Sequence, residues 1–182
     1  MLKFTYMRTP LYRYTFRNNR IREWVENRCE GPYVLNLFAG KYRLNLPEGW
    51  REIRNDLNPD MDVDYHQDSL EFVTQWAEGC KGPKFNTVIL DPPYSYRKCM
   101  TKYHGVVSSA FNQVKNRVVD ILEPNGIVIT FGYHSNVMGK TRGFEQEHIL
   151  LMSHGGAIHD TIAIMERKYS GLTRDEIGAF FI

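Results

Sequence analysis

Residues 87–94 read Thr-Val-Ile-Leu-Asp-Pro-Pro-Tyr, so an apolar run ends directly in a carboxylate and two prolines. The four residues from Thr87 to Leu90 have the composition of a buried β-strand. Asp-Pro is a common start of a turn, so the strand is expected to end at Asp91. In a parallel sheet covered by helices, ligands bind at the carboxyl ends of the strands. Residues 91–94 therefore mark a ligand site if the rest of the chain builds such a sheet.

Strand-like and helix-like segments alternate on both sides of this run. Strands are expected at residues 33–38, 52–56, 63–66, 87–90, 127–133, 149–152 and 161–165. Helices with apolar residues at helical spacing are expected after Asn18 or Asn19, after Asp68 or Ser69, and from about Val107. The alternation predicts an α/β fold with a Rossmann-like, seven-stranded, mostly parallel sheet, a terminal antiparallel hairpin strand and shortened early helices.

The length of 182 residues, with 42% hydrophobic and 24% charged residues, fits a single domain. We expect an arm and a helix in 1–30, the sheet in 31–167 and a tail in 168–182. The three cysteines form no CxxC pair and the histidines show no HExxH spacing, so neither a disulfide framework nor a metal is expected. The chain lacks a signal peptide and an apolar run of about 18 residues, which predicts a soluble, cytoplasmic protein.

The net charge of +2 hides an uneven distribution along the chain. Residues 1–54 carry a net charge of +6, residues 55–91 carry −6, residues 92–120 carry +4, and residues 121–182 carry −2. An acidic segment between basic ones suits a protein that binds a cationic small molecule beside a polyanion. Ordinary solvated surface explains the same pattern, so both interpretations stay open.

Four of the expected strands end in segments suited to binding. These are Phe38-Ala39-Gly40, Asp56-Leu57-Asn58-Pro59, Asp68-Ser69 and Asp91-Pro92-Pro93-Tyr94. Three of the four present a carboxylate. A glycine turn lets backbone groups approach a nucleoside, one carboxylate can take the ribose hydroxyls, and another can take an exocyclic amine. The pattern suggests an adenosine cofactor that requires no phosphate site.

The runs VLNLFAG, NDLNP, QDSLEF and DPPY, in this order, resemble class I S-adenosylmethionine-dependent methyltransferases. The chain is most similar to the DPPY-type amino-methyltransferases (N6-adenine-like), which act on exocyclic amines of nucleobases. The resemblance runs from about Tyr33 to Arg167, and DPPY directly after an apolar strand is its most specific element. The related glutamine N-methyltransferases have Asn where this chain has Asp91, so the resemblance argues against them.

The resemblance implies S-adenosyl-L-methionine as cofactor and assigns roles to individual residues. The implied cofactor residues are Phe38, Ala39 and Gly40 along the methionine part, Asp56 at the ribose hydroxyls, Leu57 on the adenine, Asp68 with Ser69 at the adenine amine, and Asp91. Lys41 is a further candidate, at the cofactor carboxylate, although it departs from the family pattern. The implied catalytic residues are Asp91, Pro92, Pro93 and Tyr94. Asp68 or Ser69 can at the same time cap a helix.

The chemistry accounts for these residue types. An exocyclic amine is a poor nucleophile because its lone pair is delocalised into the ring. The Asp91 carboxylate and the Pro92 carbonyl can accept its two N–H groups, so that the lone pair points at the methyl group. Tyr94 offers a flat face on which the base can stack, and in a duplex the base must first be flipped out. The expected substrate is an adenine amine in DNA or RNA.

The chain departs from the family pattern in two places. Lys41 follows Gly40 where further small residues are usual, and Asn36 stands where an acidic residue is usual. About twelve residues separate the expected strand 33–38 from the strand 52–56, and about six separate the strand 52–56 from the strand 63–66. Both connections are too short for the helices that usually join parallel strands.

Residues 2–17, in which aromatic and basic side chains alternate, either cover the sheet, as in a dimer, or stack on bases and meet phosphates.

Little of the chain is left for target recognition. Two basic loops are the candidates for substrate binding, through Tyr96, Arg97, Lys98, Lys102, Lys140 and Arg142. Such small loops suit contacts to a nucleic-acid backbone, with target recognition supplied by a partner subunit or a homodimer. The alternatives are a small-molecule N-methyltransferase, a non-catalytic nucleic-acid-binding or partner subunit, and a DPPY segment that is only a strand-ending turn.

Overall fold

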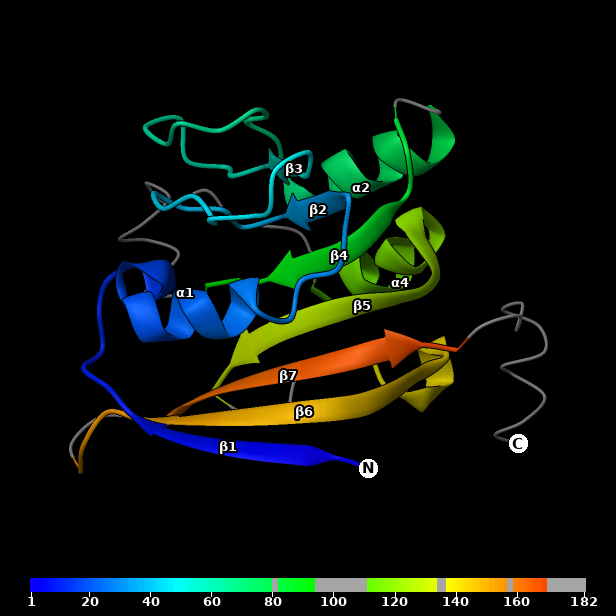
Figure 1. Ribbon diagram of the computed structural model, residues 1–182. Helices are drawn as coiled ribbons and strands as arrows, with labels where there is room; N and C mark the ends of the chain where they lie inside the picture. Colours follow the sequence, from blue (N-terminus) through cyan, green and yellow to red (C-terminus); the bar gives the residue numbers. More distant parts are fainter. Residues whose placement is uncertain (80–81, 94–110, 134–136, 157–158, 170–182) are drawn as a thin grey trace.

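The computed structural model describes residues 1–79, 82–93, 111–133, 137–156 and 159–169 (Figure 1). Within these ranges seven strands form one sheet in the order β1-β6-β7-β5-β4-β2-β3. The strands are β1 (Lys3–Arg8), β2 (Tyr33–Asn36), β3 (Arg51–Arg54), β4 (Phe85–Leu90), β5 (Leu122–Gly132), β6 (Phe144–Ser153) and β7 (Thr161–Lys168). Strand β7 is antiparallel to β5 and β6, and the other neighbours are parallel. This confirms the predicted fold class.

The set of strands differs from the predicted set at both edges of the sheet. Residues 63–66 form no strand, and one parallel bridge joins Asn55 to Tyr65. The connection is too short to carry the chain over to a new strand position, and Asp64 instead accepts a hydrogen bond from the Arg54 N–H at 2.8 Å. The seventh strand is β1, which pairs with β6 from Lys3 opposite His148 to Arg8 opposite Ser153.

Two apolar cores cover the two faces of the sheet. Leu35 and Val88 pack with the helices α2 (Ser69–Glu78) and α4 (Phe111–Ile121). Their neighbours Val34 and Ile89 point to the other face and pack with α1 (Asn19–Glu26). Figure 1 shows α1 separated from α2 and α4 by the sheet. Burial on both faces explains why the central strands are continuous apolar runs.

Both predicted helix caps are confirmed. The Asn18 carboxamide oxygen accepts from the Arg20 N–H at 3.0 Å, and the Asp68 carboxylate accepts from the Leu70 N–H at 2.9 Å. These bonds satisfy N–H groups that have no partner within the first helical turn. Among the described residues, no helix combines the length and the apolar character required to cross a membrane.

The connection from β2 to β3 contains no helix, as its length predicts, and buried polar side chains hold it instead. Glu52 accepts from the Leu44 N–H at 3.2 Å and from the Asn36 amide at 3.0 Å. Arg54, which is fully buried, donates to the Gly40 carbonyl at 2.9 Å and to the Asp62 carbonyl. Asn36, which departs from the family pattern, thus works with Glu52 to anchor the connection.

His148 ties β1 to the rest of the sheet. The Arg28 Nε–H donates to His148 Nδ1 at 3.1 Å, so Nδ1 is an acceptor and the proton of the neutral ring lies on Nε2, 2.7 Å from the Thr5 hydroxyl. Burial lowers the pKa of His148, and the charges of Arg28 and Lys3 lower it further.

We expect the free energy of unfolding to fall as the pH drops below about 6.5, the ordinary pKa of histidine. The folded state holds His148 neutral, whereas the unfolded chain takes up the proton, so protons favour unfolding. Thermal unfolding from pH 7.5 to 5.0 measures this loss, which should shrink in His148→Gln because glutamine keeps an acceptor and a donor without titrating. An equal loss in both proteins would rule out His148 as its source.

Candidate active site

Three adjoining hollows lie along the carboxyl edge of the sheet. The central pocket lies between the turn after β2, Asp56 and the N-terminal residues 14–16. The apolar slot lies over the ends of β2 and β3, and the outer pocket extends toward β6 and β7. Phe38 borders the slot and the central pocket, and Asp91 borders the central and outer pockets. The strand endings singled out in the sequence therefore share one edge.

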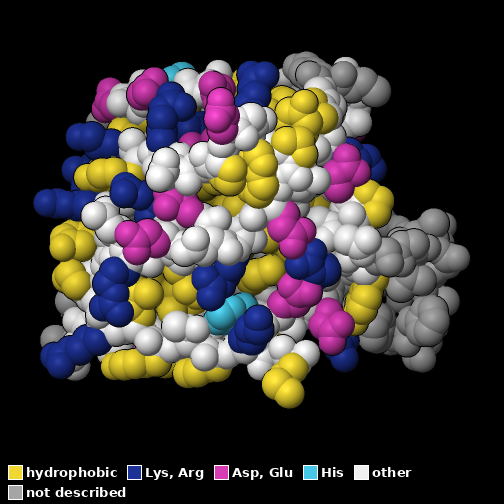
Figure 2. Space-filling view, viewed as in Figure 1, with side chains coloured by type: hydrophobic (Ala, Val, Ile, Leu, Met, Phe, Trp, Pro, Cys, Tyr) yellow, Lys and Arg dark blue, Asp and Glu magenta, His cyan; other side chains and the backbone are white. Residues whose placement is uncertain are grey.

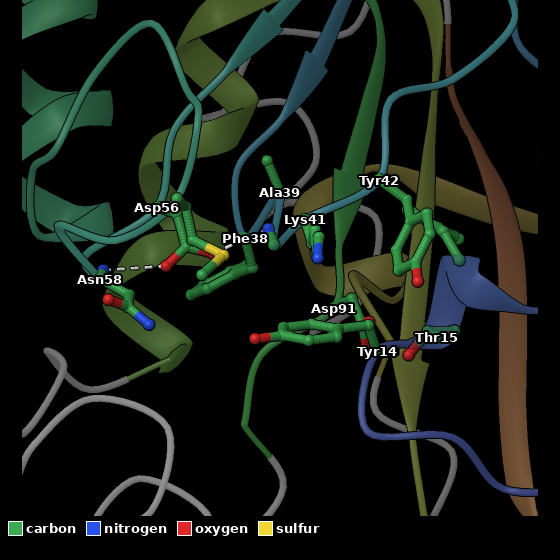
Figure 3. A pocket seen from close by; sticks show the side chains of 12 residues that line it. Tyr14, Thr15, Phe38, Ala39, Lys41, Tyr42, Asp56, Asn58 and Asp91 are labelled. Carbon is green, nitrogen blue, oxygen red and sulfur yellow. Dashed lines mark hydrogen bonds between the residues drawn. The ribbon is translucent and has the colours of Figure 1, made fainter.

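The turn at Gly40 forms one wall of the central pocket. Gly40 has φ of +55°, and a Cβ there would come within 3.3 Å of the Tyr14 ring. A side chain at this position would be strained and would press on Tyr14. Figure 3 shows Phe38 and Ala39 between Asp56 on one side of the hollow and Tyr42 on the other. Small size at position 40 thus keeps this end of the pocket open.

Asp56 holds the Gly40 turn from the neighbouring strand ending. One of its carboxylate oxygens accepts from the Gly40 N–H at 2.8 Å, and the other accepts from the Asn58 N–H at 2.9 Å. Asp56 is buried and lines the central pocket. A carboxylate only accepts hydrogen bonds, which is the chemistry that hydroxyl groups of a ligand would need. The structure thus places Asp56 in the wall of the central pocket, beside the Gly40 turn.

The apolar slot has walls suited to a flat ring. Phe38, Leu57 and Pro93 line it together with Ser69. The Ser69 hydroxyl oxygen is buried and has no hydrogen-bond partner among the residues that the structure describes. A buried hydroxyl without a partner costs free energy, so this atom is a candidate to meet a polar group of a ligand in the slot. Leu57 and Ser69, both predicted cofactor residues, therefore line the same slot.

Asp68 lies apart from its neighbour Ser69. Its carboxylate caps α2, and it borders a separate surface hollow with Glu71 and Gln75. It lines neither the apolar slot nor the central pocket. The side chains of the helix cap Asp68 and of the next residue, Ser69, point to different sides of the chain. The sequence pattern alone does not show which of the two lines the slot.

Asp91 stands at the centre of the edge. It follows β4 directly, it is half-buried, and it forms part of the wall shared by the central and outer pockets. Pro92 and Pro93 continue the wall of the outer pocket. Five further predicted residues lie outside the described part of the chain, namely Tyr94, Tyr96, Arg97, Lys98 and Lys102.

Lys140 and Arg142 lie at the opposite end of the sheet. They belong to the short helix η2 (Lys140–Arg142), which immediately precedes β6. The pairing of β5 and β6 with β7 aligns the amino end of β6 with the amino end of β5. Arg142 donates to Asn116 of α4 at 2.7 Å and to the Met138 carbonyl at 2.8 Å. The β5–β6 connection has returned to the amino edge before it reaches these residues. The structure does not bring them to the site, and we do not assign them to substrate binding.

Several residues of the central pocket had no individual role in the sequence prediction. Tyr14, Thr15, Tyr42, Asn58 and Met61 all line it, as does the predicted Lys41 (Figure 3). The alternation of aromatic residues in the N-terminal segment was the available signal for Tyr14. Its position beside Gly40 depends on pairing between β1 and β6, which lie far apart in the sequence.

Comparisons with known proteins identify the fold. No protein-family model and no curated protein matches the chain. TrmN from Thermus thermophilus superposes with a TM-score of 0.55 and 13% identity, over 82% of this chain and 47% of TrmN. SMU.776, a proposed methyltransferase complexed with SAH, gives 0.58 and 14%, over 85% and 50%. The N-methyltransferase NodS from Bradyrhizobium japonicum gives 0.59 and 12%, over 85% of this chain and 96% of NodS.

The chain therefore has the Rossmann-like fold of methyltransferases. It spans about half the length of TrmN and SMU.776. At these identities the likeness establishes the fold, and the residues of the site must carry the argument for function.

Proposed function

We propose that the chain is an S-adenosylmethionine-dependent N-methyltransferase that acts on an exocyclic nucleobase amine, adenine first, in DNA or RNA. The observation that carries this proposal is the position of Asp91 between two hollows at the carboxyl edge of a methyltransferase-like sheet, with Pro92 beside it in the wall of the outer pocket. One hollow has features suited to the cofactor, and the other is open to the substrate.

The central pocket and the apolar slot offer side chains whose chemistry suits the cofactor. The slot can take the adenine between Phe38 and Leu57, where the buried Ser69 hydroxyl lacks a partner. Asp56 can accept the ribose hydroxyls, and the ammonium group of Lys41 can meet the cofactor carboxylate. When bound, S-adenosylmethionine supplies an electrophilic methyl group on a sulfonium centre. The fit favours it over a phosphate-bearing cofactor because these walls offer two carboxylates, from Asp56 and Asp91.

Asp91 and Pro92 are the reason why we propose an amine as the methyl acceptor. A carboxylate and a carbonyl only accept hydrogen bonds, so together they can hold both N–H groups of an exocyclic amine. That arrangement turns the lone pair away from Asp91, toward the central pocket. The negative charge of Asp91 also stabilises the positive charge that grows on the nitrogen during transfer.

The test is a transfer assay with radiolabelled S-adenosylmethionine and three acceptors: DNA, structured RNA and a protein extract. Label in a polynucleotide, released as a methylated nucleoside on digestion, is the expected result. Label only in protein, unchanged by Asp91→Ala, would contradict the proposal. Calorimetric titration with the cofactor separates this from a non-catalytic protein, which would bind no cofactor.

Ser69→Ala should lower the affinity for S-adenosylmethionine about 3- to 10-fold, because the variant loses one hydrogen bond to the adenine edge. The melting temperature without cofactor should stay the same or rise, since the hydroxyl has no partner there. Calorimetry and thermal unfolding measure the two effects. Thr74→Ala, on the same helix but outside the slot, is the matched control. Unchanged affinity in Ser69→Ala would place the adenine elsewhere.

A further inference from the structure

The outer pocket has the N-terminal segment as one of its walls. Residues 10–13 face Asp91, Pro92 and Pro93 across it, and His154 and Thr161 of the β6–β7 hairpin complete it. The wall that faces the reactive edge is therefore built from residues far from it in sequence. An acceptor that occupies this pocket beside Asp91 therefore also lies beside residues 10–13.

This segment, residues 9–18, forms a closed loop that we call the arm loop. The Thr9 N–H donates to the Ser153 carbonyl at 3.0 Å, and the Asn18 amide donates to the Thr9 hydroxyl. His154 Nδ1 lies 2.8 Å from the Thr9 carbonyl, which can only accept, so the ring donates there, and Nε2 lies 2.9 Å from the Thr161 hydroxyl. The ends of the loop are thus fixed by buried polar contacts.

The tip of the arm loop remains accessible while its base is buried. Phe16 packs edge-on against Phe131 with ring centroids 5.8 Å apart, and it is 4% exposed. Leu11 and Tyr12 are 39% and 38% exposed, although both border the outer pocket. Large apolar side chains held at a pocket mouth by a fixed loop are suited to contact a flat ligand.

All charged side chains in the arm loop and in the residues that precede it are positive. Residues 1–22 contain six Lys or Arg and no Asp or Glu. Of these six, only Arg22 forms an ion pair among the described residues, with Glu26 at 3.4 Å. The guanidinium of Arg17 lies 5.0 Å from the centre of the Tyr12 ring, and that of Arg13 lies 5.5 Å from the centre of the Tyr14 ring. Stacking on a ring holds a guanidinium while its N–H edge can still bind an anion.

Figure 2 shows Lys and Arg side chains along the left margin of the molecule, where the N-terminal segment and the connection after β2 run in Figure 1. A free amine of small size would gain little from several unpaired guanidinium groups near the pocket. A polynucleotide presents a phosphate on each side of the reacting nucleotide, and interleaved arginines and aromatic rings match that repeat.

We propose that the arm loop is the polynucleotide-binding element of this protein, an inference that rests on the proposed function. The base of one unpaired nucleotide enters the outer pocket beside Tyr12 and presents its amine to Asp91. Arg13 and Arg17 bind the phosphates that flank it. The arm loop thereby supplies contacts that the sequence-predicted Lys140 and Arg142 cannot make.

The test compares two double variants with the same loss of charge. Arg13→Gln/Arg17→Gln removes the arm-loop cations, and Arg51→Gln/Lys140→Gln removes two exposed cations at the amino edge of the sheet. Binding of fluorescein-labelled 20-residue single strands of DNA and of RNA is measured from 50 to 300 mM salt. The arm-loop variant should bind more weakly, and its plot of log affinity against log salt should flatten by about 1.4, or roughly 0.7 for each lost phosphate contact. The control pair should bind like the unaltered protein.

Tyr12→Ala should weaken binding at least about fivefold and raise KM for the oligonucleotide, and Tyr12→Phe should restore both because it keeps the ring. Cofactor affinity should stay the same in every variant.

Unchanged salt dependence in the arm-loop variant, with cofactor binding and polynucleotide methylation intact, would overturn this inference and leave the proposed function standing. Absence of cofactor binding in the unaltered protein would instead remove the proposed function. Equal binding of DNA and RNA strands would support recognition through phosphate and base, whereas label in a small-molecule amine alone would overturn the arm-loop assignment.

Discussion

Asp91→Ala is expected to slow methyl transfer by about 10²- to 10⁴-fold, the range seen when a group that handles a proton or charge at the reacting atom is removed. Alanine takes away an acceptor for the amine and the charge that stabilises the growing cation, while the main chain at Pro92 remains. Cofactor affinity should change far less, because Gly40, Asp56 and the apolar slot keep their contacts. Single-turnover rates with saturating cofactor measure the effect.

Two further variants locate the cause of that loss. Asp91→Asn keeps a carbonyl oxygen as acceptor and removes the charge, so its rate should lie between those of the unaltered protein and Asp91→Ala. Lys140→Ala, at the amino edge of the sheet, should have the rate of the unaltered protein. If Asp91→Ala kept more than half of the original rate, Asp91 would not hold the amine.

Arg54→Ala should lower the free energy of unfolding by about 3–5 kcal/mol, as expected when one partner of a buried ion pair is removed. Arg54 is fully buried, and its Nε lies 3.7 Å from Glu52. Burial raises the pKa of Glu52, while hydrogen bonds from Asn36 and Leu44 and the charge of Arg54 oppose that rise. Without Arg54 the carboxylate loses its ion-pair partner, and the Gly40 carbonyl loses a donor. Urea denaturation measures the change.

The double variant Arg54→Met/Glu52→Gln tests whether the lost charge pair is the cause. It should recover part of the stability, because no unpaired charge then remains buried. Cofactor affinity should still fall in both variants, since Arg54 anchors the turn at Gly40. If the double variant is no more stable than Arg54→Ala, the loss comes from packing around the guanidinium instead.

Local patterns explain which parts of the structure could be predicted from the sequence. The caps at Asn18 and Asp68 and the central strands follow from residues within a few positions of each other. The grouping of Asp56 and Asp91 on one edge follows from a general property of parallel sheets. The absence of a helix between β2 and β3 could be predicted by counting the residues between the two expected strands.

Long-range pairing explains what could not be predicted. β1 has a strand-like alternation, but its partner β6 begins more than 130 residues later, so its position in the sheet was not visible. The same pairing carries Tyr14 to Gly40 and Tyr12 to the outer pocket. The prediction that Lys140 lies at the substrate site failed for a related reason. The sequence does not show that the chain returns to the amino edge of the sheet before β6 begins.

The pairing of β1 with β6 also determines when the outer pocket can exist during synthesis. The first strand leaves the ribosome long before residues 144–153, its only sheet neighbour among the described strands, have been made. Until then Thr9 has neither Ser153 nor His154 to hold it, and the arm loop has no wall to close against. A nascent chain can therefore assemble β2, β3 and the Gly40 turn early, but it gains a complete outer pocket only after Thr161 has been made.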